Sequence, residues 1–158
     1  MKTNYELRYA SNPVDAKTYD TARLRHDFLI ETLFVGDEVN MVYSMYDRMI
    51  VGGAMPVGED LLLEAIAPLR APHFTTRREV GIFNVGQGEG TVRVGDEVYT
   101  LGFKEALYIG SGDRDITFHS NNATTPAKFY FNSTPAHTSY PTRKITKADA
   151  ISVHMGSL

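Results

Sequence analysis

The sequence predicts an all-β protein, an antiparallel barrel or sandwich that carries one or two short helices. About nine short apolar runs have the length of strands and are separated by glycine or proline, which is the pattern of small β-barrels and sandwiches. Two of these runs, Thr91–Val94 and Glu97–Leu101, are joined by Gly95-Asp96. Glycine in the first central position is what a type II′ hairpin turn requires. Segments with helical spacing are few and short.

Each predicted element follows from its local sequence. Asp20 is suited to cap a helix over Thr21–Phe28, which has an apolar pair four residues apart. The apolar segment from Asp60 to Ala67 is bounded by Pro68, so we expect a helical turn or a long apolar loop there. Thr146 and Asp149 have the spacing of a capping box that begins a one-turn helix. The predicted strands are Leu29–Val35, Val39–Met45, Arg48–Val51, Glu79–Val85, Thr91–Val94, Glu97–Leu101, Leu107–Ile109, Ile116–His119 and Lys128–Asn132.

Length and composition limit the class of protein. A chain of 158 residues suits a single domain, which we divide into an arm and helix (1–28), a barrel (29–134) and a loop and tail (135–158). The absence of cysteine excludes disulfides and sulfur-based metal sites. A net charge of −3 gives no electrostatic footprint for nucleic acid, and no apolar run is long enough to span a bilayer. We therefore expect a cytoplasmic protein with neither nucleic-acid nor membrane partners.

Two spaced sets of residues fall between positions 73 and 113. In the first set His73, Thr75 and Glu79 are followed by a glycine at position 86, and in the second Gly102 is followed by a glycine at position 110 and by Asp113. The spacing resembles the two metal-binding blocks of the cupin family, H-x-H-(x)3-E-(x)6-G and G-(x)5-P-x-G-(x)2-H. The resemblance implies an antiparallel jelly-roll β-barrel with a metal site inside.

Two of the four ligand positions of that template are not histidine. Thr75 and Asp113 replace histidines, and threonine is a poor ligand for zinc. His73, Glu79 and Asp113 could still supply a mixed nitrogen and oxygen site. We nevertheless predict a vacated site, a barrel kept for packing that binds no metal tightly.

Other residues are candidates for contact with a ligand or a partner. Arg77 and Arg78, next to Glu79, could bind a carboxylate substrate through paired hydrogen bonds, and strand alternation predicts that one points inward and the other into solvent. His137 lies between two prolines in a loop, and loops often carry function on β scaffolds. Tyr140 belongs to a set of tyrosines that offers surface for association.

Four blocks resemble one particular cupin family along nearly the whole chain, from about Asp15 to Leu158. They are DFLIETLFVGDEVNMVYSMYDRMIVGGAMP, RREVGIFNVGQGEGTVRV, EALYIGSG and TPAKFYFNSTPAHTSYPTRKIT. These blocks are similar to the N-terminal half of the 5-keto-4-deoxyuronate isomerases, also called 4-deoxy-L-threo-5-hexosulose-uronate ketol-isomerases. The chain ends about where the linker into the second half would begin, so it resembles a fragment or a naturally halved version.

The resemblance implies a two-cupin enzyme of pectin and uronate breakdown. Such an enzyme interconverts 5-keto-4-deoxyuronate and a 2,5-diketo-3-deoxy sugar acid, and holds zinc through three histidines and a glutamate of its C-terminal cupin. The H-x-H-(x)4-E block of that site does not occur here, so we expect zinc and catalysis in a second half. This half would then supply scaffold and surface for a homo-oligomer or for the C-terminal cupin.

The chemistry leaves the general base open. A ketol isomerisation passes through an enediolate, so it needs a base and an electrophile that holds the developing oxyanion. Glu79, Asp113 or His73 could act as the base, and Arg77 could replace the metal as the electrophile. One alternative is a metal-free cupin that only binds or assembles. Another is a metal-free epimerase, which requires His119 or His73 inside the barrel beside a tyrosine.

Overall fold

The computed structural model describes residues 2–156, and most of its regular elements are strands. The α-helix α1 spans Thr21–Phe28, and three 3-10 helices span Asp15–Thr18 (η1), Ala67–Leu69 (η2) and Lys147–Asp149 (η3). The strands are β1 (Lys2–Arg8), β2 (Glu38–Ser44), β3 (Ile50–Ala54), β4 (Leu61–Leu62), β5 (Arg78–Asn84), β6 (Gly90–Val94), β7 (Glu97–Leu101), β8 (Ala106–Ile109), β9 (Ile116–Ser120), β10 (Phe129–Pro135) and β11 (Arg143–Ile145).

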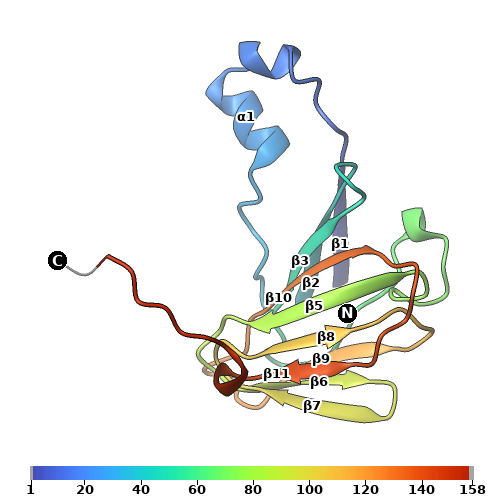
Figure 1. The fold of residues 1–158 in the computed structure, drawn as a ribbon, viewed down its shortest axis with the longest axis vertical. Coiled ribbons are helices and arrows are strands. Elements are labelled where there is room, and N and C mark those ends of the chain that lie inside the picture. Colours follow the sequence, from blue (N-terminus) through green and yellow to red (C-terminus); the bar gives the residue numbers. More distant parts are fainter. Residues whose placement is uncertain (1, 157–158) are drawn as a thin grey trace.

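The strands form two sheets. One has the order β1-β2-β3-β10-β5-β8-β11 and the other has the order β4-β9-β6-β7. Figure 1 shows them as two layers of one jelly-roll. The prediction of an all-β, cupin-type fold is confirmed, with two differences. Among the described strands no ladder closes the two sheets into one barrel, and β1 runs parallel to β2 rather than antiparallel.

The core lies between the two sheets and is made by alternation along the strands. In β5 the side chains of Val80 and Ile82 are buried while those of Glu79 and Phe83 are not, as the period of two in a strand requires. Phe118 of β9 stacks on Phe129 of β10 at a ring-centroid distance of 5.2 Å, and on Phe131 at 6.2 Å. Aromatic and aliphatic side chains therefore fill the space between the two sheets.

Local signals in the sequence predicted several elements accurately. Helix α1 has the predicted bounds, and the carboxylate of Asp20 accepts a hydrogen bond from the backbone N–H of Arg23 (2.8 Å). Gly95 has φ 58° at the hairpin between β6 and β7, in agreement with the predicted turn. The capping box at Thr146 and Asp149 is also present and begins η3.

Other predicted elements were wrong. Residues 29–35 form no strand; Leu33 instead packs over Gly53 of β3, and β1 occupies the place beside β2. The segment from 60 to 67, predicted as a helical turn or an apolar loop, contains the short strand β4 paired with β9, then a loop that leads into η2 at Ala67. The predicted strand Arg48–Val51 begins later, at Ile50, and runs through both glycines to Ala54. A glycine is needed at position 52 because the ring of Phe131 lies against it and leaves no room for a side chain.

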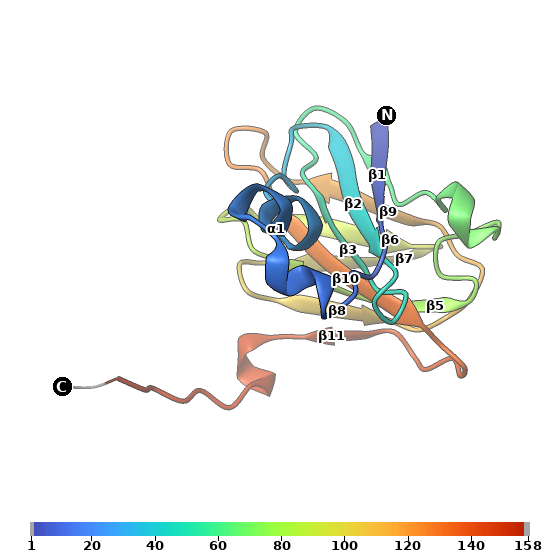
Figure 2. The same ribbon diagram turned by 90° about the horizontal axis from the view of Figure 1, so that it is seen from above.

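The part of the N-terminal arm that follows β1 projects from the sheets (Figure 1), whereas β1 itself is an edge strand of the seven-stranded sheet. Figure 1 places η1 and α1 at the opposite end of the molecule from β6 and β7, and Figure 2 shows the same pair from above. No residue of α1 is buried. In the part of the chain that the structure describes, no helix has the length and apolar character needed to cross a bilayer.

Candidate functional site

A cavity of about 460 Å³ opens where the start of β5, the end of β10, η2 and the turn between β2 and β3 meet. Its positively charged and imidazole side chains are those of Arg48, Arg70, Arg77, Arg78 and His137. We call this cavity the cationic pocket. No aspartate or glutamate among residues 2–156 lines it. Its remaining wall is mainly apolar and includes Pro68, Leu69, Phe74 and Pro135.

Arg78 is the buried member of the cationic pocket, with 5% of its surface exposed. Its Nε donates to Oγ of Ser133 (3.1 Å), and its Nη2 donates to the carbonyl oxygens of Ser133 (2.8 Å) and Arg48 (2.6 Å). The guanidinium lies 5.5 Å from the ring centre of Tyr43. Burial lowers the pKa of Arg78, and the positive charge of Arg48 acts in the same direction. The side chain is therefore held by neutral groups.

The other basic residues surround Arg78 at the exposed rim. Nη2 of Arg77 donates to the carbonyl oxygens of Leu69 (2.8 Å) and Arg70 (3.1 Å), which fixes η2 against the start of β5. The backbone N–H of Ala136 donates to the carbonyl oxygen of Arg77 (3.1 Å), which brings His137 to the same opening. The rim is thus built by backbone contacts and leaves its charges facing the cavity.

The structure brings together three of the residues that the sequence suggested. Arg77, Arg78 and His137 line one pocket; Arg78 is buried and Arg77 is exposed, although Arg77 precedes β5 and strand alternation does not apply to it. Tyr140 does not line the pocket; its backbone packs against Gly110 instead. Arg48 and Arg70 were missed. Both have a left-handed backbone at a turn, with φ 52° and 45°, and no pattern in the sequence reveals that such turns meet.

The four positions of the metal template are dispersed. His73 and Thr75 precede β5 in a turn and do not share a strand. Nδ1 of His73 is 3.0 Å from Oδ1 of Asp115, and the fully buried hydroxyl of Thr75 donates to the carbonyl oxygen of Gly112 (2.9 Å). Asp113 is exposed.

Glu79 lies on the outer face of the seven-stranded sheet. Its neighbours along β5, Arg78 and Val80, are both buried, so alternation directs Glu79 away from the core. The hydroxyl of Tyr108 donates to Oε2 of Glu79 (2.6 Å). Burial and this carboxylate raise the pKa of Tyr108 to about 12, so the phenol keeps its proton at neutral pH.

Comparison with known proteins identifies the family. The model of the KduI/IolB family matches residues 33–158. The chain belongs to this family. It is 69% identical over 158 residues to 4-deoxy-L-threo-5-hexosulose-uronate ketol-isomerase 1 of Bacteroides thetaiotaomicron, and 67% identical to the ketol-isomerase of Bacteroides fragilis. The corresponding protein of Formosa agariphila is 51% identical. Each match covers all of this chain and 56% of the relative, so the chain spans about half the length of these curated relatives.

Two solved structures of cupins are also similar to this chain. The cupin domain of Schizosaccharomyces pombe Cnp3 has a TM-score of 0.40 at 11% identity, covering 56% of this chain and 52% of that one. A cupin protein from Bacteroides fragilis has a TM-score of 0.40 at 15% identity, covering 67% of this chain and 77% of that one.

Zinc, which the KduI/IolB resemblance implies, does not fit the residues of this chain. Glu79 points away from the core, while His73 and Asp113 lie in separate turns. Among residues 2–156 no three histidine, aspartate or glutamate side chains gather as a metal site would require. The cupin template does not apply because β5 begins only at Arg78. Its H-x-H positions, His73 and Thr75, therefore lie in a turn, where side chains two residues apart need not point to the same side.

The histidines do not provide the acid–base pair of an epimerase. Nδ1 of His119 is 2.6 Å from Oδ1 of Asp60, and about half of the His119 side chain is exposed. His73 is bound to Asp115 in its turn. The epimerase hypothesis requires one of these two rings to face the interior of the fold beside a tyrosine. Neither ring lies there.

Proposed function

We propose that this chain forms part of a uronate ketol-isomerase, as the N-terminal cupin half of the longer enzyme. The observation that carries the proposal is 69% identity over the whole chain with a protein named 4-deoxy-L-threo-5-hexosulose-uronate ketol-isomerase 1. The reaction would interconvert 5-keto-4-deoxyuronate and a 2,5-diketo-3-deoxy sugar acid, within the breakdown of pectin and uronates.

The chemistry divides the work between this chain and the rest of such an enzyme. Isomerisation through an enediolate needs a base and a group that stabilises the oxyanion. Bound zinc would supply the second as a Lewis acid, and we assign it to the part of the enzyme outside this chain. Glu79, Asp113 and His73 share no cavity here, so none of them is proposed as the base. This half would contribute scaffold and assembly surface.

A complementation assay tests this proposal. The 158-residue chain is assayed for isomerisation of 5-keto-4-deoxyuronate alone, and again after genetic fusion to the remainder of the Bacteroides thetaiotaomicron relative. We expect turnover and bound zinc only in the fusion. Full turnover by the 158 residues would refute the need for a second half. A folded fusion that holds zinc and does not turn over the substrate would refute the assignment itself.

An assembly module without its own activity is the second candidate. The observation that favours it is the arm, in which α1 buries no residue and Leu24, Phe28 and Leu29 are 41%, 50% and 39% exposed. Burial of such side chains between copies would stabilise a homo-oligomer. Light scattering decides this point. A monomer at all accessible concentrations, in the chain and in the fusion alike, would contradict it.

A further inference from the structure

The cationic pocket concentrates positive charge in a protein that is acidic overall. It holds four of the ten arginines of the chain, together with His137. Arg48, Arg70, Arg77 and Arg78 take part in none of the ion pairs formed among residues 2–156. Like charges so close repel one another unless an anion lies between them. The arrangement is therefore electrostatically incomplete as it stands.

Burial increases the free-energy cost of the uncompensated charge at Arg78. A buried charge is ordinarily paired, because leaving water without a counterion is costly. Here the guanidinium is hydrogen-bonded only to neutral groups, the oxygens of Ser133 and Arg48 and the side chain of Tyr43. An oxyanion in the pocket would supply the missing charge. Guanidinium groups are particularly suited to planar carboxylates, which they bind through two parallel hydrogen bonds.

The shape and the remaining wall of the pocket indicate the kind of anion. A cavity of about 460 Å³ lies in the range of small-molecule sites. Pro68, Leu69, Phe74 and Pro135 add apolar surface to its wall. A bare inorganic ion would leave that surface without contacts. A ring or chain of carbon atoms carrying one carboxylate would use both the charges and the apolar surface.

We propose that the cationic pocket binds the carboxylate of a small sugar acid, with Arg78 at the floor and Arg48, Arg70 and Arg77 at the rim. His137 lies at the opening and meets the hydroxyl groups of the sugar. We propose it as a binding site, because none of the candidate bases Glu79, Asp113 and His73 lines it. That the sugar acid is the uronate of the isomerase reaction rests on the proposed function.

Calorimetry on the full 158-residue chain tests this site with D-galacturonate as the probe and D-galactose as its neutral analogue. We expect galacturonate to bind and galactose not to bind. Arg48→Met and Arg70→Met change exposed side chains that form no hydrogen bond or ion pair with the rest of residues 2–156, and each is expected to weaken binding by about tenfold. Arg78→Met should weaken binding by more than either. Arg93→Met, which removes the same charge from β6 outside the pocket, should leave binding unchanged.

The outcomes separate this site from the proposed function. Loss of binding in Arg48→Met and Arg70→Met, with circular dichroism unchanged, supports the site even if the fusion protein fails as an isomerase. Equal weakening by Arg93→Met would overturn it, since the effect would then be one of overall charge. Inorganic phosphate that binds as tightly as galacturonate would also overturn it. Galacturonate that fails to bind would overturn the site and leave the isomerase assignment intact.

Discussion

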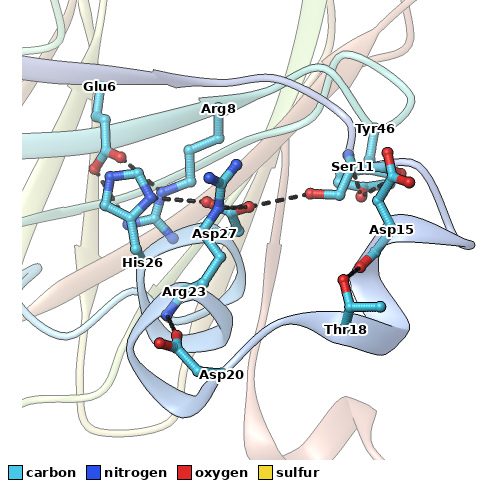
Figure 3. Close-up of polar contacts among 10 residues, drawn as sticks. All are labelled: Glu6, Arg8, Ser11, Asp15, Thr18, Asp20, Arg23, His26, Asp27 and Tyr46. Atoms are coloured by element: carbon cyan, nitrogen blue, oxygen red, sulfur yellow. Dashed lines mark hydrogen bonds and ion pairs between the residues drawn. The ribbon is translucent and has the colours of Figure 1, made fainter.

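Arginines in two regions of this molecule have opposite electrostatic surroundings. In the N-terminal arm, shown in Figure 3, Nε of Arg8 is 2.9 Å from Oε1 of Glu6, and Nε of Arg23 is 2.7 Å from Oδ2 of Asp27. In the cationic pocket Arg78 is bonded only to neutral oxygens. In each of these arm pairs one side chain is exposed (Glu6 47%, Arg23 58%) and the charges are compensated, whereas the pocket is partly buried and no carboxylate among residues 2–156 lines it.

This difference shows where a ligand would add the most free energy. An exposed ion pair contributes little, because water already screens both charges. A buried cation without a partner gains much more from an added anion, since its surroundings screen the new attraction poorly. The arm in Figure 3 is therefore electrostatically complete, and the pocket is the part of the chain where a small acid would change stability.

The largest effect is expected for Arg78→Ala. This substitution removes three hydrogen bonds and leaves a cavity at the edge of the core. We therefore expect the free energy of unfolding to fall by about 3 kcal/mol. Urea denaturation measures it. The matched change in the arm, Arg23→Ala, should leave the midpoint unchanged within error. Similar urea midpoints for both variants would mean that the two arginines contribute equally to stability. The contrast between the two regions would then not hold.

Ligand binding should produce the next largest effect. At a galacturonate concentration 100 times its dissociation constant, the free energy of unfolding should rise by about 2.7 kcal/mol. For a domain of this size that corresponds to a rise in melting temperature of roughly 5 to 10 °C. Differential scanning calorimetry measures the shift. Arg93→Met should show the whole shift and Arg78→Met almost none; a full shift in Arg78→Met would place the ligand elsewhere.

The sequence predicted the local structure better than it predicted the site. Asp20 and Gly95 each act through neighbours in the chain, so their cap and turn could be predicted from spacing alone. The strand over 29–35 was wrong because its place beside β2 is taken by β1, a contact between distant segments. Apolar composition cannot distinguish a strand from an extended segment that packs over a sheet.

The site depended even more on distant contacts. Arg77, Arg78 and His137 stay predictions for ligand contact, and the sequence did not show that they line one pocket. Arg48 and Arg70 line the pocket only because two turns that are far apart in the chain meet beside β5. The template that included Glu79 assumed that the residues before Arg78 form a strand, and an apolar count does not fix where a strand begins.

A smaller effect is expected on the outer face of the seven-stranded sheet, where a carboxylate is satisfied without an arginine. Tyr108→Phe removes the hydrogen bond to Glu79, and we expect a loss of about 1 kcal/mol in the free energy of unfolding. Tyr99→Phe is the matched control, because Tyr99 donates to the exposed Glu97 and should lose less. Urea denaturation compares the two. Weaker galacturonate binding in Tyr108→Phe would contradict the separation of this face from the pocket.

The smallest effect should come from the arm, and it depends on pH. The hydrogen bond from His26 and that from Arg23 lower the pKa of Asp27 from an ordinary value of 3.8 to about 2. A carboxyl group whose pKa is lower in the folded state contributes its stability above pH 4 and loses it as the pH falls toward 2. Asp27→Asn should therefore be slightly less stable than the parent at pH 7, with the difference vanishing toward pH 2.

His26→Ala should raise the pKa of Asp27 more than Arg23→Met does, as followed by NMR of the carboxyl carbon. If neither variant moves it, the pairing in Figure 3 is not what compensates the arm, and its contrast with the cationic pocket loses its basis.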